Sequence, residues 1–230
     1  MIDIHTHLLP LIDDGSPDME SSLRLLEEAA KIGTTTMFLT PHYIQSRNYL
    51  SPYEENVKIF EEFVQEAKFR RINVELYLGT EIYYRLESVR DLKAKRVVPL
   101  GKTNRVLLEF HETEEQEDVA EAIHNMKTLG YVPIIAHIER YSYLHRLEDL
   151  QIIKKMGAMI QVNASSVIGK SGRADQKTIL KWMKLGLIDF VASDIHVFRQ
   201  NDMLEAYRLV EKKLGKVAAE RMFHNTAIFS

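Results

Sequence analysis

The sequence contains no cysteine, and no apolar run in it approaches the ~20 residues that a membrane-spanning helix needs. The absence of cysteine excludes disulfides, thiolate metal sites and a cysteine nucleophile. The N-terminus lacks a basic region followed by an apolar core, so we expect no secretory signal peptide. Taken together, these absences favour a cytoplasmic protein.

An excess of charge of either sign is also absent. The chain has 30 Lys and Arg residues against 33 Asp and Glu residues, a formal net charge of −3. This balance gives no electrostatic reason to expect binding to nucleic acid or to an anionic membrane. The 230 residues, 45% of them hydrophobic, fit one large globular domain. Because no repeat, low-complexity tract or linker interrupts the chain, we predict a single domain over residues 1–230.

What the chain does contain is a regular alternation of short apolar segments and longer amphipathic ones. The predicted strands are residues 1–7, 34–40, 73–78, 105–110, 131–136, 158–162 and 187–192. The predicted helices are residues 19–32, 52–71, 86–95, 115–129, 147–156, 174–185, 203–214 and 216–223. Such alternation favours parallel strands joined by right-handed helical crossovers. We therefore predict an α/β fold, a (β/α)7 barrel distorted relative to the eight-stranded form.

The first predicted strand ends in two histidines, His5 and His7. Side chains two residues apart in a strand project to the same side, so both imidazoles would point together from its C-terminal end. Such a pair can chelate a transition metal. With nine histidines in the chain, an isolated pair also arises by chance. The interpretation therefore depends on whether other strands bring further ligands.

Further ligand-type side chains do follow the other predicted strands. They are Asp14 after the first strand, His42 after the second, Glu81 after the third, Glu109 at the end of the fourth, His137 after the fifth, and Asp194 and His196 after the seventh. All would lie at the C-terminal face, where α/β barrels carry their active sites. Nine nitrogen and oxygen ligands are too many for one ion and favour two or three, with Glu81 as a bridge. Without thiolates, Mn²⁺, Fe or Zn²⁺ are favoured.

A cluster of metal ions points to a particular chemistry. Ions ~3.5–4 Å apart generate hydroxide at neutral pH and clamp the oxygens of a phosphoryl group during in-line displacement. Arg140 follows the fifth strand, and a guanidinium is a common partner of phosphate. The residues therefore predict a metal-dependent phosphomonoesterase in which a metal-bridging hydroxide attacks phosphorus. No phosphoenzyme is required, in keeping with the absence of cysteine.

The segments around these residues resemble the PHP (polymerase and histidinol phosphatase) superfamily. The matching segments are Asp3-Ile4-His5-Thr6-His7, Asp13-Asp14-Gly15, Thr40-Pro41-His42, Gly79-Thr80-Glu81-Ile82-Tyr83, Leu107-Leu108-Glu109-Phe110, Ala136-His137-Ile138-Glu139-Arg140-Tyr141, Gln161-Val162-Asn163-Ala164-Ser165-Ser166 and Ala192-Ser193-Asp194-Ile195-His196. Within the superfamily the chain is most similar to bacterial tyrosine-protein phosphatases of capsule and exopolysaccharide operons, the CpsB/CapC type. The similarity covers essentially the whole chain.

The resemblance implies a TIM-like PHP barrel with three divalent ions, usually Mn²⁺. It assigns His5, His7, Glu81 and Asp194 to the first ion, Glu81, Glu109 and His137 to the second, and Asp14, His42 and His196 to the third. It makes Arg140, His137 and Asp14 catalytic, and Arg140 a phosphate ligand. It suggests the same substrate-binding role for Arg199, although the loop before Arg199 is shorter than the family pattern. The implied substrate is phosphotyrosine on a membrane-associated bacterial tyrosine kinase that controls polysaccharide export.

Three other functions fit parts of the pattern. A small-molecule phosphatase, for example of histidinol phosphate, would use the same ligands. An amidohydrolase shares the paired histidines and the late aspartate, but usually has a bridging lysine where this chain offers Glu81 and Glu109. A non-enzymatic metal-binding or scaffold protein would hold ions without turnover. Within the first loop, either Asp13 or Asp14 could serve as the ligand, and the resemblance favours Asp14.

Overall fold

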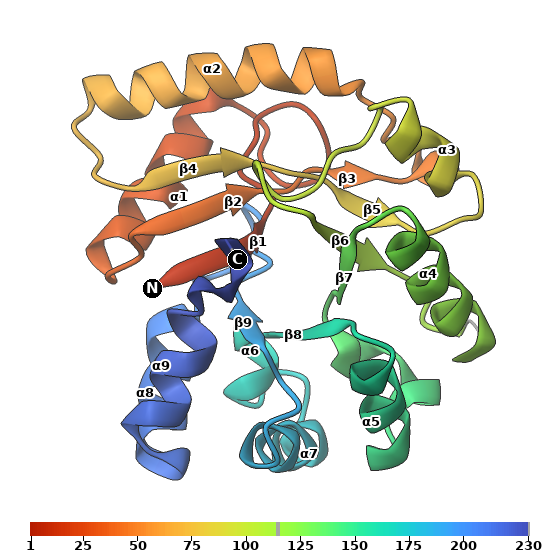
Figure 1. The fold of residues 1–230 in the computed structure, drawn as a ribbon. Coiled ribbons are helices and arrows are strands. Elements are labelled where there is room, and N and C mark those ends of the chain that lie inside the picture. Colours follow the sequence, from red (N-terminus) through yellow and green to blue (C-terminus); the bar gives the residue numbers. More distant parts are fainter. Residues whose placement is uncertain (114–115, 230) are drawn as a thin grey trace.

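Parallel strands curl into a barrel-like wall surrounded by helices in the computed structural model, which describes residues 1–113 and 116–229 (Figure 1). One sheet has the order β1-β2-β4, formed by Ile2–Thr6, Thr36–Leu39 and Glu75–Leu78. The other has the order β3-β5-β6-β7-β8-β9, formed by His42–Tyr43, Glu81–Tyr83, Arg105–Glu109, Val132–Ile135, Met159–Asn163 and Phe190–Ala192. The predicted parallel α/β architecture is confirmed.

Two of the seven predicted strands are each followed, after a two-residue break, by a further short strand. The second is interrupted at Thr40 and Pro41 and continues as β3, while the third is interrupted at Gly79 and Thr80 and continues as β5. Pro41 has no backbone N–H to donate to a neighbouring strand, but its carbonyl still accepts a hydrogen bond from Glu81. The sequence analysis did not predict β3 or β5.

The wall closes between the first and last strands. His7 donates its backbone N–H to the carbonyl of Ile195 at 3.0 Å, and Asp194 donates to the carbonyl of His5 at 3.0 Å. Asp194 and Ile195 follow the last residue of β9, and His5 and His7 lie at the C-terminal end of β1. Closure therefore brings the segment with Asp194 directly against the segment with His5 and His7.

The predicted helices are confirmed with ends shifted by a few residues. They are α1 (Met19–Lys31), α2 (Tyr53–Phe69), α3 (Ser88–Lys93), α4 (Gln116–Thr128), α5 (Leu147–Lys155), α7 (Arg173–Lys184), α8 (Met203–Leu214) and α9 (Lys216–Phe223). Residue 115, where the α4 prediction began, lies outside the described residues. The one-turn helix α6 (Ala164–Val167) was not predicted, nor were the 3-10 segments Gln45–Arg47, Ile138–Arg140, Ser142–Leu144 and Thr226–Phe229.

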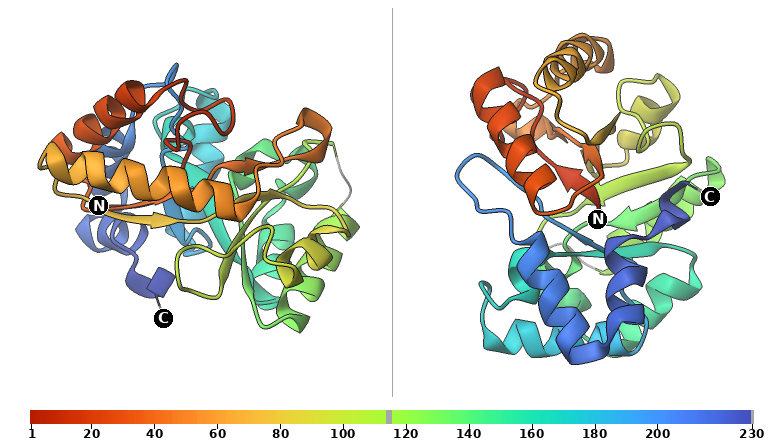
Figure 2. Two further views of the ribbon diagram at one scale, coloured as in Figure 1. Left: turned by 90° about the horizontal axis from the view of Figure 1, so that it is seen from above. Right: turned by 90° about the vertical axis from the view of Figure 1, so that its left-hand side faces the viewer.

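The core lies on both faces of the strands. In β2, Met37 and Leu39 pack with Leu26 of α1 and Phe63 of α2, whereas Phe38 points the opposite way, into the barrel. Figures 1 and 2 show α1 and α2 covering the three-stranded sheet, with α8 and α9 on the opposite side of the strands. None of the helices in the described residues is both long and apolar enough to cross a membrane.

The inward-facing side chains change from apolar to polar along the strands. Ile4, Phe38, Leu107, Ile134 and Phe190 are buried together inside the barrel. Inward positions closer to the C-terminal strand ends carry polar groups instead, among them Gln161 and Asn163 of β8 and Glu109 of β6. The interior of the barrel is therefore apolar, and its opening at the C-terminal strand ends, the polar mouth, is lined by polar side chains.

Candidate metal centre

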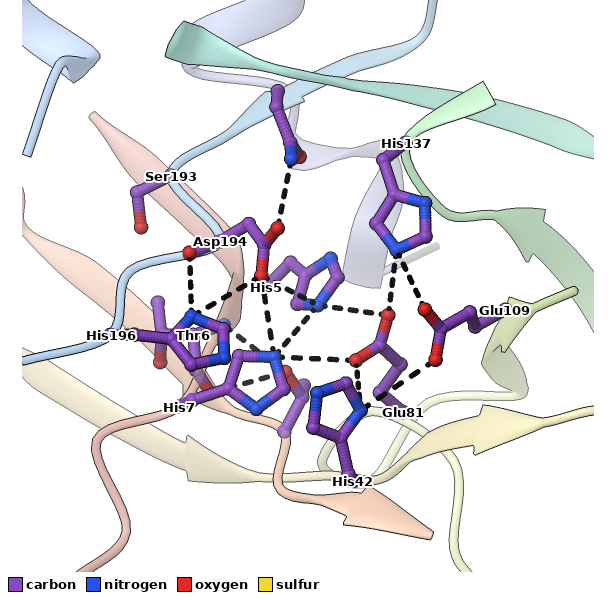
Figure 3. Close-up of polar contacts among 12 residues, drawn as sticks. His5, Thr6, His7, His42, Glu81, Glu109, His137, Ser193, Asp194 and His196 are labelled. Carbon is purple, nitrogen blue, oxygen red and sulfur yellow. Dashed lines mark hydrogen bonds and ion pairs between the residues drawn. The ribbon is translucent and has the colours of Figure 1, made fainter. Parts of the chain in front are cut away.

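All nine predicted metal ligands lie at this polar mouth. Figure 3 shows His5, His7, His42, Glu81, Glu109, His137, Asp194 and His196 pointing toward one another from the C-terminal ends of the strands. Asp14 reaches the same cluster from the loop between β1 and α1, 3.6 Å from His42 and 3.5 Å from His196. Asp14 is 37% exposed, whereas the histidines of the cluster are buried.

The first group consists of His5, His7, Glu81 and Asp194. His5 Nε2 lies 3.1 Å from His7 Nε2, 3.1 Å from Glu81 Oε1 and 3.7 Å from Asp194 Oδ1. His7 Nε2 lies 3.2 Å from Glu81 Oε2 and 3.4 Å from Asp194 Oδ1. Two imidazole nitrogens and two carboxylates thus face one point, an arrangement that suits a divalent cation.

The second group shares Glu81 with the first. His137 Nε2 lies 3.1 Å from Glu81 Oε1 and 3.6 Å from Glu109 Oε1. His42 Nδ1 lies 3.7 Å from Glu109 Oε2. Glu81 Oε1 faces both His5 and His137, and Oε2 faces His7, so Glu81 could serve both groups.

The third group lies at the outer edge of the cluster. Ligand atoms of His7, His42 and His196 lie within 4.8 Å of one another, as do those of Asp13, Asp14 and His42. The rings of His7 and His196 stack with centroids 4.2 Å apart. Several imidazole nitrogens thus face one buried space, and a cation placed there could accept a lone pair from each.

Unpaired buried atoms give an independent test of the fit to metal ions. His42 Nδ1, Glu81 Oε2 and Glu109 Oε2 are buried and have no hydrogen-bond partner among the described residues. His42 Nδ1 and Glu81 Oε2 are 2.8 Å apart, yet their geometry is not that of a hydrogen bond. A buried polar atom without a partner is costly, and a bound cation would satisfy all three. The donor set therefore fits metal ions.

The carboxylates show the same requirement for positive charge. Burial and the neighbouring charge of Glu81 raise the pKa of Glu109 to about 9. Burial alone would raise the pKa of Glu81 too, but His5 and His42 hold it well below its usual range. Burial alone would also raise the pKa of Asp194, but His5, His7 and Arg140 together hold it well below its usual range. In the absence of metal ions, a proton on Glu109 and the charges of neighbouring histidines therefore offset the negative charge of the buried carboxylates. Bound cations would do the same.

The histidines divide into two kinds. Burial would lower the pKa of His7, but the charge of Asp13 raises it well above its ordinary value. Burial and the nearby Arg140 lower the pKa of His137 to about 4, and burial and His7 lower that of His196 to about 4. His137 and His196 are therefore neutral near pH 7, which is the form that binds metal.

Two arginines meet at Asp194. Arg140 Nη2 lies 2.5 Å from Asp194 Oδ2, and Arg199 Nη1 lies 2.8 Å from the same oxygen. Their side chains are 32% and 40% exposed, so each guanidinium also faces the mouth. Despite the short loop before it, Arg199 lies beside Arg140.

Two residues have supporting roles that the sequence analysis did not assign. The side chain of Asp13, one of the two candidate ligands in the first loop, is buried and accepts hydrogen bonds from His7 Nδ1 at 2.8 Å and from the backbone of His42 at 2.9 Å. Gln161 Oε1 lies 3.3 Å from His5 Nδ1 and accepts the backbone N–H of His137 at 2.8 Å. The inward position of Gln161 in an otherwise apolar strand was the available signal.

Local backbone geometry also supports the cluster. His137 and Asp194 have φ values of 31° and 49°, in the left-handed region that non-glycine residues adopt rarely. A Cβ on Gly15 would lie 2.1 Å from the carbonyl oxygen of His7. Glycine is therefore needed where the loop carrying Asp13 and Asp14 passes over His7.

Comparisons with known proteins agree with this geometry. The model of the family described as "Capsular polysaccharide synthesis, CpsB/CapC" matches residues 1–228. Tyrosine-protein phosphatase CpsB of Streptococcus agalactiae is 32% identical over 235 residues, spanning 99% of this chain and 96% of that protein. Tyrosine-protein phosphatase YwqE of Bacillus subtilis is 29% identical over 244 residues, spanning 100% of this chain and 94% of that protein.

Solved structures show the same fold. One, from work on YwqE of Bacillus subtilis and CpsB of Streptococcus pneumoniae as metal-dependent tyrosine phosphatases, has a TM-score of 0.87 and 28% identity, and covers 95% of this chain and 90% of that chain. A histidinol phosphate phosphatase from Lactococcus lactis has a TM-score of 0.55 at 12% identity over 92% of this chain and 93% of that one, a likeness of fold alone.

Proposed function

Because the chain belongs to the CpsB/CapC family of capsular polysaccharide synthesis, we propose that it is a metal-dependent protein-tyrosine phosphatase. The observation that carries this proposal is the convergence of nine candidate ligands beside two arginines that share Asp194. A ligand cluster of this size next to cationic groups suits phosphoryl transfer, in which negative charge must be neutralised on several oxygens at once.

Three divalent ions, most simply Mn²⁺ with Fe or Zn²⁺ as alternatives, would be held by the three groups. His5, His7, Glu81 and Asp194 would hold the first, Glu81, Glu109 and His137 the second, and Asp14, His42 and His196 the third. Bound there, the ions would lower the pKa of water and neutralise phosphoryl oxygens.

The chain's own residues bind and orient the substrate around that centre. Arg140 and Arg199 donate N–H groups to the phosphate oxygens, and their shared contact with Asp194 fixes both guanidinium groups beforehand. His137 is oriented by Tyr141, whose Oη lies 3.2 Å from His137 Nδ1, so its Nε2 faces the centre. Asp14 is the most exposed of the carboxylates in the ligand set, so we place it nearest the entering substrate.

The substrate we propose is phosphotyrosine on a protein, specifically a bacterial tyrosine kinase that regulates capsular or exopolysaccharide synthesis. The names of the relatives as tyrosine-protein phosphatases and the capsule role of the family support this choice. A cytoplasmic location stays a prediction, and cell fractionation would test it.

Phosphate release by the purified protein tests the function. We expect chelation to abolish hydrolysis of p-nitrophenyl phosphate and of a phosphotyrosine peptide, and Mn²⁺ to restore it. His137→Ala should lose most of this activity, since it removes a ligand that Glu81 and Glu109 both face. Activity that is unaffected by chelation, or unchanged in His137→Ala, would refute the mechanism.

Histidinol phosphate is the second candidate substrate, because the fold is shared with a histidinol phosphate phosphatase. Rates on histidinol phosphate and on the phosphotyrosine peptide, measured side by side with equal Mn²⁺, separate the two. We expect a higher kcat/KM for the peptide.

A further inference from the structure

A surface hollow opens directly beside the metal centre. It has a volume of about 390 Å³, and Glu109 forms part of its lining. One wall is the segment 110–113 after β6, and the other comprises Ser46, Arg47 and Tyr83. Glu109 is 16% exposed in its side chain, so the cluster is reachable from this side.

A second hollow continues away from the first. It has a volume of about 410 Å³ and runs past Arg85 and Glu87 to Ser88, the first residue of α3. Ser46 and Tyr83 line both hollows. The two hollows therefore adjoin at Ser46 and Tyr83, and together they extend from Glu109 to α3. We name them together the β5–α3 channel.

The channel is larger than the reacting group requires. A phosphotyrosine side chain whose phosphate lies at the metal centre would meet the channel at Glu109, the lining residue that belongs to the ligand set. The portion beyond Ser46 and Tyr83 would stay without a ligand unless the substrate extends further. A polypeptide in extended form advances ~3.3 Å per residue and can follow such a channel.

The chemistry of the walls suits a peptide rather than a charged small molecule. Glu109 belongs to the metal centre, and Arg47 lies 3.8 Å from Asp14 of the same centre. Of the other charged lining residues, Arg85 offsets one of Glu87 and Glu112, and Asp91 is paired with Arg96 at 2.8 Å. Outside the metal centre, these walls therefore carry only a small net charge. The hydroxyl of Ser46 and the ring of Tyr83, with the Arg85 guanidinium 4.6 Å from its centroid, offer a hydrogen-bonding group and a flat surface.

We propose that the β5–α3 channel binds the residues on one side of the phosphotyrosine in a polypeptide substrate. This rests on the proposed phosphatase function and adds the surface by which a protein substrate is distinguished from a small aryl phosphate. The flanking residues bind along Ser46, Tyr83 and Arg85, and the chemistry stays at the metal centre.

Kinetics on matched substrates test the proposal. The substrates are p-nitrophenyl phosphate, free phosphotyrosine, and two phosphotyrosine peptides extended only toward the N-terminus or only toward the C-terminus. In the wild type with Mn²⁺ we expect one of the two extensions to lower KM about fivefold or more relative to free phosphotyrosine. Ser46→Trp, which fills the middle of the channel, should abolish that gain and leave kcat/KM for p-nitrophenyl phosphate within about twofold.

Two more variants keep the result interpretable. Arg85→Ala removes the group over Tyr83 without adding bulk and should weaken the extended peptide in the same direction. Lys213→Trp alters a separate hollow of about 450 Å³ lined by α7, α8 and α9 and should not change the kinetics on any of the four substrates. The channel proposal is overturned if neither extension lowers KM, or if Ser46→Trp and Arg85→Ala affect all four substrates equally. A wild-type protein that hydrolyses none of them overturns the phosphatase function itself.

Discussion

Replacing Asp13 with asparagine tests whether this buried carboxylate organises the metal ligands. Three donors surround it: His7 Nδ1 at 2.8 Å and the His42 backbone N–H at 2.9 Å on Oδ2, and the Gly15 backbone N–H at 2.9 Å on Oδ1. A carboxylate accepts all three bonds. An asparagine amide has a single acceptor oxygen, and its NH₂ group must face at least one of these donors.

The size of the effect follows from that mismatch. At least one buried hydrogen bond is lost, which costs about 1–3 kcal/mol of stability. His7 also loses the carboxylate that fixes its ring and makes it more basic. Loss of a group that orients a metal-ligating histidine typically lowers metal affinity about 10–100-fold, and we expect the half-saturating Mn²⁺ concentration to rise by that factor.

The assay is a Mn²⁺ titration of metal-free protein followed by p-nitrophenyl phosphate hydrolysis, with thermal unfolding measured in parallel. Asp18→Asn is the matched control, because Asp18 lies on the same loop but only caps α1 through the Ser21 N–H at 2.7 Å. Asparagine caps helices equally well, so this control should titrate like the wild type. A folded Asp13→Asn variant with an unchanged Mn²⁺ midpoint would refute the reasoning.

Four further predictions follow from the same structure. With a pKa of about 9, Glu109 is protonated at pH 7 in the metal-free protein and must lose its proton to bind a metal ion. Mn²⁺ binding to Glu109→Gln should therefore release about one proton fewer than binding to the wild type. Calorimetry in buffers of different ionisation enthalpy measures this difference. Because of that raised pKa, the contribution of Glu109 to the stability of the metal-free protein falls as pH rises from 4.5 to about 9. In Glu109→Gln this fall should be absent from the pH dependence of Tm. Gly15→Ala should lower stability by about 1–3 kcal/mol in urea unfolding, because its Cβ overlaps the carbonyl of His7, and wild-type stability would contradict this. Tyr141→Phe should raise the Mn²⁺ midpoint about tenfold by freeing His137 Nδ1, and an unchanged midpoint would count against that contact.

The convergence of the candidate ligands was predictable because it follows from strand order. A parallel barrel brings the C-terminal ends of all its strands to one face, so His5, Glu81 and Asp194 could be placed together without knowledge of side-chain conformations. Their division among three ions came from the family resemblance and stays a prediction. The helix ends were similarly local, since Gly33, Gly130 and the other glycines at those ends adopt positive φ.

What sequence reasoning missed depends on contacts between distant segments. Asp13 and Asp14 are neighbours of the same type, and only the passage of Gly15 over His7 decides which one is buried. The position of Arg199 on Asp194 depends on how the loop after β9 turns back, which loop length alone does not reveal. The β5–α3 channel is lined by residues from three separate segments of the chain, so no single sequence motif predicts it.

Whether the nine side chains hold metal ions is tested most directly by anomalous diffraction at the manganese edge from crystals of Mn²⁺-loaded protein. We predict three anomalous peaks within the cluster: one among His5, His7, Glu81 and Asp194, one among Glu81, Glu109 and His137, and one among Asp14, His42 and His196. A fully loaded, active crystal with no anomalous peak among these residues would contradict the metal centre and the phosphatase mechanism built on it.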